Sequence, residues 1–413
     1  MIKKLNILIV AFILFLSTGL SAQNSSAGVE PPRLSALSAL LVDYDTGRIL
    51  YGKNQDKRIP PASMTKVMTL LLCYDAIAAG ELSKDQIVTI DEKGSSFSRP
   101  PFSSLMLLEE GQEVSVLDLM KGLAISSGND AAYAIAGLLG PDLRSFIDKM
   151  NERAWSLGMD STVFVDPDGW SKFNMVTAED FALLARAYIS LYPEALEELH
   201  SQEFMVYPLP QNMPEGKTFR IEVPRKKRNT NLLLGRVDGV DGLKTGYIDE
   251  SGFNFTGTAI RDGQRLISII MGIRTDTYYQ GLQLRAKESE MLLEYGFSNF
   301  SYHPFPEIQV DEVKAWYGDV PAVLPVPEYP AEMVLSREEL ERIESRIALA
   351  DEVFAPLSAG TKLGSVEYYL DGVLLDTGEI VLAEDLNQGA WYSRLRDFFT
   401  LQWRALKEGM NRN

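Results

Sequence analysis

The stretch Pro60-Pro61-Ala62-Ser63-Met64-Thr65-Lys66, followed by Val67 to Cys73, predicts a buried helix with polar groups at its start. The two prolines stop the preceding chain, and apolar side chains then recur at helical spacing around nearly the whole circumference. A helix that is apolar on nearly every side lies inside a protein. Ser63 and Lys66, three residues apart, share one face at its N-terminus.

Outward from this helix, hairpin patterns stand at both ends of a helical region. Asp45-Thr46-Gly47 joins two apolar runs, and Arg261-Asp262-Gly263-Gln264 joins the strands expected over 252–260 and 265–273. Helices are expected over 116–124, 130–139, 143–157, 178–191 and 280–295. We therefore predict an α+β domain over residues 34–300, with an antiparallel sheet built from both ends.

Beyond residue 300 the composition changes twice. Prolines and short alternating segments around Asp371-Gly372 predict a small β-rich domain over 305–388. Residues 390–413 form an amphipathic pattern with several arginines, and its apolar side comprises Tyr392, Leu395, Phe399, Trp403, Leu406 and Met410. A basic helix with aromatic side chains on its apolar side is typical of the membrane interface. The alternative is a helix docked on its own domain.

The first 22 residues are typical of a secretory signal peptide. Lys3 and Lys4 precede an apolar run over 7–16, and small residues follow up to Ala22. Ten apolar residues are too few to cross a bilayer comfortably. We expect the mature chain to work outside the cytoplasm, in the periplasm or an equivalent compartment, and to attach peripherally to the cytoplasmic membrane.

Charge and rare residues exclude several classes of protein. The 413-residue chain has a net charge of −17, which argues against nucleic acid as a partner, and Arg225-Lys226-Lys227-Arg228 is expected to be a solvated loop. Cys73 is the only cysteine and is expected to be a buried, inert thiol. His200 and His303, the only histidines, have no metal-ligand spacing and are expected in loops or at the surface. We expect no metal and no cofactor.

Two further motifs follow the first in order. Ser127-Gly128-Asn129 lies between two predicted helices, and Lys244-Thr245-Gly246 leads into the predicted strands. Each motif alone is also compatible with a purely structural role, as an N-cap serine with a surface lysine or as a polar turn. Together and in this order they are typical of serine enzymes that attack a peptide or β-lactam carbonyl.

The chemistry explains why these residue types belong together. Ser63 is a poor nucleophile until a base removes its proton, and with so few histidines that base is expected to be Lys66. Burial and a second cation such as Lys244 favour the neutral amine. The Ser127 hydroxyl is suited to relay a proton to the leaving group, and Asn129 to hold the substrate backbone.

The third motif is expected on an edge strand, where an extended peptide can pair with it. Lys244 and Thr245 would attract a carboxylate, and Gly246 would allow close backbone approach. The backbone N–H groups of Ser63 and Tyr247 would stabilise the oxyanion.

With these residues in place, the sequence resembles a known family. Segments 125–132, 164–169 and 239–247, together with 355–360 and 369–372 in the β-rich part, are similar to the low-molecular-mass penicillin-binding proteins, the serine-type D-alanyl-D-alanine carboxypeptidases. The likeness extends over about residues 34–386. It implies a β-lactamase/transpeptidase-like catalytic domain, then a small β-rich domain and a C-terminal amphipathic membrane anchor.

The resemblance also implies roles and partners. Ser63 would be acylated by the penultimate D-Ala of a peptidoglycan stem pentapeptide, Lys66 would be the base, and the terminal D-Ala would leave. Arg274 would join Lys244 and Thr245 in binding the terminal carboxylate. β-Lactam antibiotics such as penicillin would trap Ser63. Many relatives carry His where Asp168 and Tyr247 stand here.

Two rival hypotheses share parts of this pattern. A β-lactamase has the same three motifs but usually lacks the β-rich domain and the terminal anchor, and it would turn penicillin over without a lasting adduct. A non-catalytic cell-wall binding protein on the same scaffold would not need all three motifs intact.

Overall fold

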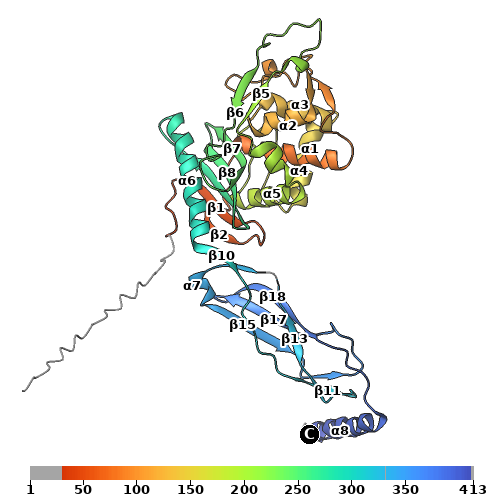
Figure 1. Ribbon diagram of the computed structural model, residues 1–413. Helices are drawn as coiled ribbons and strands as arrows, with labels where there is room; N and C mark the ends of the chain where they lie inside the picture. Colours follow the sequence, from red (N-terminus) through yellow and green to blue (C-terminus); the bar gives the residue numbers. More distant parts are fainter. Residues whose placement is uncertain (1–29, 331, 411–413) are drawn as a thin grey trace, which may run out of the picture.

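The computed structural model describes residues 30–410 apart from residue 331, without the side chains of 408–410. The predicted signal peptide, residues 1–22, lies outside the described residues. The described chain is elongated: a mixed helix and sheet part is followed by a β-rich part, and a single helix lies at the far end (Figure 1). The predicted α+β class is confirmed.

A five-stranded antiparallel sheet forms the centre of the first part. Its order is β2-β1-β9-β8-β7, so β1 near the start of the described chain pairs with β9, more than 200 residues later. The sheet is thus built from both ends, as predicted. The strands are β1 (Ser38–Asp43), β2 (Ile49–Lys53), β7 (Val240–Ile248), β8 (Gly252–Arg261) and β9 (Gln264–Ile273). Among the described residues β7 pairs only with β8, which leaves its other edge open.

Both faces of this sheet are buried. Successive side chains of a strand point to opposite faces, so Leu40 and Val42 pack into the helical core while Ala39 and Leu41 pack on the other side. The long helix α6 (Tyr278–Asn299) covers that second face (Figure 1). Continuous apolar strands in this region follow from burial on both sides.

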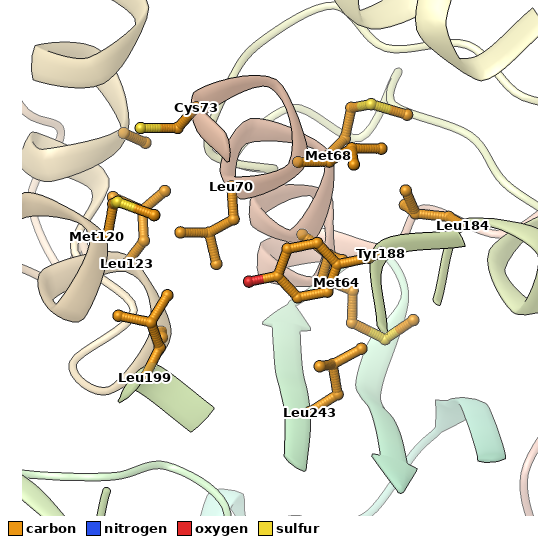
Figure 2. Packing of buried hydrophobic residues seen from close by; sticks show 14 of the residues in the cluster. Met64, Met68, Leu70, Cys73, Met120, Leu123, Leu184, Tyr188, Leu199 and Leu243 are labelled. Atoms are coloured by element: carbon orange, nitrogen blue, oxygen red, sulfur yellow. The ribbon is translucent and has the colours of Figure 1, made fainter. Parts of the chain in front are cut away.

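The opposite face carries the helices, with the predicted apolar helix at their centre. Figure 2 shows α1 surrounded by side chains from neighbouring helices and from β7, among them Met120, Tyr188 and Leu243. Cys73 is fully buried here, and burial raises the pKa of its thiol to about 12, as expected of an inert thiol. The helices are α1 (Lys66–Ala78), α2 (Val116–Ala124), α3 (Asn129–Leu139), α4 (Leu143–Ser156) and α5 (Ala178–Leu191).

One boundary differs from its expected place. The α-helix begins at Lys66 rather than near Ser63, because Ala62–Thr65 forms a 3-10 turn. The predicted capped start at Thr177 is present: its side chain accepts a hydrogen bond from Asp180 N at 3.0 Å.

Four short strands form two antiparallel pairs outside the central sheet. The first pair is β3 (Ile87–Thr89) with β4 (Glu113–Ser115), and the second is β5 (Phe204–Tyr207) with β6 (Arg225–Arg228). The basic run 225–228, expected to be a solvated loop, is therefore a mostly exposed strand.

The β-rich part consists of small sheets around two apolar clusters. A four-stranded sheet has the order β13-β18-β17-β15, and its central hairpin turns at Asp371-Gly372, where both residues have positive φ, as the sequence predicts. The elements are β10 (Phe300–His303), β11 (Val313–Trp316), β12 (Ala322–Val323), β13 (Pro325–Glu328), β14 (Met333–Ser336), α7 (Arg337–Leu340), β15 (Ile343–Leu349), β16 (Glu352–Phe354), β17 (Lys362–Leu370) and β18 (Val373–Leu382).

Polar contacts join the two parts near β1 and β2. Arg48 pairs with Glu339 at 2.6 Å and also donates to the Val334 carbonyl, while the Tyr302 hydroxyl donates to Asp45 at 2.6 Å. The Arg48–Glu339 pair is about four-fifths shielded from solvent on each side, so it holds the parts together more firmly than an exposed pair would.

The C-terminal helix α8 (Trp391–Met410) leaves its aromatic side chains in solvent. Trp391, Phe399 and Trp403 are each more than 60% exposed. The helix meets the β-rich part through polar contacts, with Asp397 accepting from Tyr317 N at 3.0 Å and Arg404 pairing with Glu352 at 2.7 Å. Nowhere in residues 30–410 does a helix combine the length and apolarity needed to cross a bilayer.

Candidate active site

Ser63 sits in a tight turn between α1 and the open-edged strand β7. The residue before it, Ala62, has a φ of +52°, a conformation that costs energy for any residue with a Cβ and is often kept at functional sites. A Cβ on Gly246 would come within 2.4 Å of the Pro61 carbonyl oxygen and 3.2 Å of Ser63 N. The glycine of the third motif therefore lets β7 approach the serine turn.

Lys66 lies directly beneath Ser63 and is fully buried. Its Nζ lies 2.8 Å from Ser63 Oγ, 2.8 Å from Asn129 Oδ1 and 2.6 Å from the Asp168 carbonyl oxygen. The alternative of a snorkelling surface lysine is excluded by this burial. The one-turn spacing read from the sequence brings the amine into hydrogen-bond contact with the hydroxyl.

The second motif meets the third on the other side of the cleft. Lys244, 1% exposed, donates from Nζ to Ser127 Oγ at 3.0 Å and to the Thr245 carbonyl at 3.1 Å. Ser127 adopts a φ of +57° in the loop between α2 and α3, and Asn129 begins α3. The three motifs, which span more than 180 residues of sequence, therefore meet in one place.

These residues line a cleft of about 810 Å³. Its walls include Ser63, Ser127, Asn129 and residues 245–250, which are the end of β7 and the turn after it, together with Phe102 and Trp170. The Thr245 hydroxyl lies 2.6 Å from the Thr230 hydroxyl, which also faces the cleft. The Tyr247 side chain is partly exposed, donates its hydroxyl to Asp249 at 2.6 Å and packs its ring against Phe253 and Tyr278.

Arg274 is the one predicted site residue that the structure does not bring to this cleft. Its guanidinium donates to the backbone carbonyls of Asp249 and Glu250, and it lines a separate groove near the start of α6. The strand β9 ends just before it, at Ile273, and Arg274 is not among the residues that line the cleft. The sequence placed Arg274 by resemblance alone, and its position departs from that expectation.

A different arginine lines the cleft instead. Arg285 on α6 is 4% exposed, and among the described residues its hydrogen-bond acceptors are the backbone carbonyls of Gly246, Asn254 and Thr230 at 3.4–3.5 Å. No carboxylate among the described residues pairs with it within 4 Å. Burial lowers the pKa of its guanidinium to about 10, and a buried cation with such weak partners suits an incoming anion.

Sequence reasoning missed Arg285, although a signal was present. On α6 it falls in register with the buried positions Gly281, Ser289 and Leu292, at helical spacings of four and seven. A charged residue on the apolar stripe of a helix is rarely placed there without a partner or a function.

The environment of the site shifts the pKa of both lysines downward, toward the neutral amine. Burial lowers the pKa of Lys66 to about 8, against the opposing attraction of Asp168 and other carboxylates. Burial lowers the pKa of Lys244 well below its usual value, and the charges of Lys66 and Arg285 lower it further. Asp168 is 1% exposed, and burial raises the pKa of its carboxyl to about 7.

His200 lies in the core, which corrects the expectation of a loop or surface histidine. It is 1% exposed, and its ring nitrogens lie 2.9 Å from the Leu243 carbonyl and 3.0 Å from the Tyr188 hydroxyl. The carbonyl needs a donor, so Nδ1 carries the proton and Nε2 accepts from Tyr188. Burial lowers the pKa of His200 to about 4. Its carbonyl partner directly precedes Lys244 in the chain.

Residues 30–410 contain no group of three or more His, Cys, Asp or Glu side chains arranged to hold a metal ion.

Two family models match the sequence. Residues 25–275 match the model described as D-alanyl-D-alanine carboxypeptidase, and residues 307–388 match the C-terminal domain of penicillin-binding protein 5.

Characterised relatives and solved structures give the same picture over nearly the whole chain. The sequence is 33% identical to D-alanyl-D-alanine carboxypeptidase DacD of Escherichia coli, over 96% of this chain and 98% of that protein. The fold is similar to penicillin-binding protein 5 from Haemophilus influenzae, with a TM-score of 0.70 and 30% identity, over 87% of this chain and 100% of that one. Penicillin-binding protein D2 from Listeria monocytogenes, solved with ampicillin bound, is 34% identical with a TM-score of 0.54, over 65% of this chain and 100% of that one.

Proposed function

This chain belongs to the D-alanyl-D-alanine carboxypeptidase family, and we propose that it removes the terminal D-Ala of peptidoglycan stem pentapeptides through an acyl-enzyme on Ser63. The observation that carries the proposal is the 2.8 Å contact between Ser63 Oγ and the fully buried Lys66 Nζ. A serine hydroxyl in contact with an amine of lowered pKa is an activated nucleophile.

Lys66 acts as the general base in its neutral form. A neutral amine has two N–H donors and one lone pair. The Asn129 and Asp168 oxygens occupy two directions as acceptors, which leaves the lone pair for the Ser63 hydroxyl proton. Ser63 Oγ then attacks the carbonyl carbon of the penultimate D-Ala, while the proton moves to Lys66 Nζ.

The oxyanion forms between the backbone N–H groups of Ser63 and Tyr247. The close approach at Gly246, where an added Cβ would stand 3.2 Å from Ser63 N, supports this pairing of the two donors. Removing one such donor typically costs about 3–4 kcal/mol of transition-state stabilisation. The open edge of β7 is free to pair with the extended substrate backbone.

Departure of D-Ala needs a proton on its amine. The contact of Ser127 Oγ with Lys244 Nζ supports a relay in which Ser127 gives its proton to the leaving amine and recovers one from a lysine. Asn129 has its carbonyl oxygen on Lys66, which leaves its NH₂ group for the substrate backbone. Water then attacks the acyl-enzyme by the same route in reverse.

We assign the terminal carboxylate to Thr245, Thr230 and Arg285 rather than to Arg274. The two threonine hydroxyls face the cleft 2.6 Å apart, and the buried Arg285 guanidinium lies beside them with its Thr230 carbonyl contact at 3.5 Å. A carboxylate there would exchange weak carbonyl contacts for a charge-assisted hydrogen bond.

Penicillin presents the same carbonyl and carboxylate as the substrate, so it acylates Ser63 and remains there. The likeness to a protein solved with ampicillin bound supports this.

We further propose that the chain works outside the cytoplasm and that α8 rests on the cytoplasmic membrane. The exposed aromatic side chains of α8 and its basic residues support interfacial binding.

The experiment that tests the proposed reaction is release of free D-Ala from a pentapeptide ending in D-Ala-D-Ala. We expect release by the wild type and none above background by Ser63→Ala, with unchanged circular dichroism and thermal melting as the folding control. No release by folded wild type, with rapid hydrolysis of penicillin, would replace this proposal by a β-lactamase. If folded wild type neither releases D-Ala nor hydrolyses penicillin, the hypothesis of a non-catalytic wall-binding protein would replace this proposal.

A further inference from the structure

Asp168 is a buried residue whose backbone carbonyl contacts the proposed base and whose carboxyl no step of the proposed reaction uses. It precedes Gly169 and Trp170, which line the cleft, and only 1% of it is exposed. A buried carboxyl without a full set of partners costs free energy, so its presence next to an amine needs an explanation.

The loop around Asp168 is fixed on α1 by three neighbouring residues. The Pro167 carbonyl accepts from Thr69 Oγ1 at 2.6 Å, and the Asp168 carbonyl accepts from Lys66 Nζ at 2.6 Å. A Cβ on Gly169 would stand 1.9 Å from the Ala62 carbonyl oxygen, so that residue packs directly on the serine turn. Residue 168 is therefore held against Lys66 from both sides.

Asp166 and Asp168 have unlike environments although they are two residues apart. Asp166 accepts from Gly169 N, Ser171 N and Asn174 Nδ2, all at 2.7–2.8 Å, which satisfies a charged carboxylate. Asp168 accepts one backbone N–H, from Trp170 at 3.1 Å. The hydrogen bonds of Asp166 therefore maintain the loop. The Asp168 carboxyl, with one such bond, interacts with the groups around it mainly through its charge.

We propose that Asp168 is a positioning residue whose negative charge sets the proton affinity of Lys66, and with it both the pH at which Ser63 is acylated and the strength of the base. This inference rests on the proposed function. The negative charge favours the ammonium form of Lys66, so it raises the pH needed to free the amine. It also stabilises the ammonium that forms as Ser63 attacks, which makes Lys66 a stronger base.

Other charges near this pair act on it from the surrounding elements. On α3, Asp130 favours the Lys66 ammonium from a distance, but its oxygens are occupied by the backbone N–H groups of 106–108. Asp166, in the same loop as Asp168, also favours the Lys66 ammonium, and the charges of Lys66 and of Lys244 on β7 repel each other. Tyr133, also on α3, stays neutral because burial and the Asp168 and Asp166 charges raise its pKa to about 12. Asp168 is the largest of the opposing influences on Lys66, and burial together with Asp166 raises its own pKa.

The test is the rate constant for acylation by a fluorescent penicillin, measured from pH 4 to 9 so that deacylation does not enter. Compared with wild type, Asp168→Asn removes the charge while keeping the volume. We expect the midpoint of the rise in rate to move down by about one pH unit or more. The plateau rate at high pH should fall by about three- to tenfold because the base is weaker.

Three comparisons make the result decisive. Asp168→Glu keeps the charge and should keep the wild-type midpoint, and Asp160→Asn removes an exposed carboxylate and should change neither midpoint nor plateau. If Asp168→Asn fails to fold, as judged by its thermal melt, Asp168→Ser replaces it with the same expectation. A lower plateau with an unchanged midpoint would mean a merely structural role and overturn the inference. Wild type that is not acylated at any pH would instead overturn the proposed function.

Discussion

The cleft and the C-terminal helix break the usual rule of burial in opposite directions. In the cleft, Lys66, Lys244 and Arg285 are nearly or fully buried, although such side chains are rarely buried without a partner. On α8, Phe399 and Trp403 are more than 60% exposed, although large aromatic side chains are usually covered. In Figure 1, α1, β7 and α6, which carry these cations, lie in the mixed helix and sheet part, and α8 lies beyond the β-rich part at the far end.

Each region lacks a binding partner, and the chemistry of its side chains indicates what that partner is. The buried Arg285 guanidinium, which has weak carbonyl contacts, needs an anion small enough to enter the cleft. Exposed aromatic side chains on a basic helix need a large apolar surface outside the molecule. The first region carries the proposed reaction, and for the second we propose binding to a membrane surface.

The largest effect that separates the two regions should come from Arg285. We expect Arg285→Leu to lower kcat/KM for the pentapeptide by about 100-fold, mostly through KM, because the carboxylate loses its charged partner. Arg274→Leu is the matched control and should change kcat/KM by less than about threefold, since a solvent-side arginine contributes little. Steady-state kinetics decide the point, and a large loss in Arg274→Leu alone would contradict the assignment.

His200 extends the comparison to a buried titratable group with complete partners. Its pKa falls from the ordinary 6.5 to about 4 on burial, so the unfolded chain binds the proton first as the pH falls. The folded state should therefore lose about 2 kcal/mol of stability from this group between pH 7 and pH 5. Urea unfolding at both pH values measures the loss.

The variant His200→Phe cannot titrate, so its stability should depend on pH less steeply by that amount, even if it is less stable at pH 7. Equal pH dependence in wild type and variant would show that His200 is already protonated or already accessible in the folded state.

The smallest effect concerns the exposed helix. We expect Trp403→Ser to weaken binding to vesicles containing anionic lipid by about tenfold, since one large aromatic side chain no longer enters the interface. Hydrolysis of a soluble pentapeptide should be unchanged, and Gln402→Ala should leave both properties unchanged. Sedimentation with vesicles gives the binding. Loss of soluble activity in Trp403→Ser would mean that α8 serves the catalytic part instead.

Patterns that are local in sequence predicted the fold well. The helix after Pro60-Pro61 and the hairpins at Asp45-Thr46-Gly47 and Asp371-Gly372 follow from periodicity and turn residues, and the structure confirms them. The start of α1 was misplaced by three residues because the tertiary contact with β7 tightens the Ser63 turn into a 3-10 form.

Contacts between distant segments could not be read in the same way. Arg285 reaches the cleft because α6 packs across β8 and β9, from where its side chain extends to the Gly246 and Asn254 carbonyls, and no local pattern encodes that packing. The place of Asp168 depends on the loop that Gly169 allows to dock on Ala62. His200 was assigned to the surface because its partners, Tyr188 and Leu243, lie 12 and 43 residues away.

The acylation of Ser63, with Lys66 as the base, is the central claim, and intact-protein mass spectrometry after brief exposure to penicillin at pH 7 tests it most directly. Wild type should gain the mass of one penicillin, located by peptide mapping on the segment containing Ser63. Folded Ser63→Ala should gain none, and folded Lys66→Met should react at least about 100-fold more slowly. An adduct on another residue, or equal labelling of folded Ser63→Ala, would contradict it.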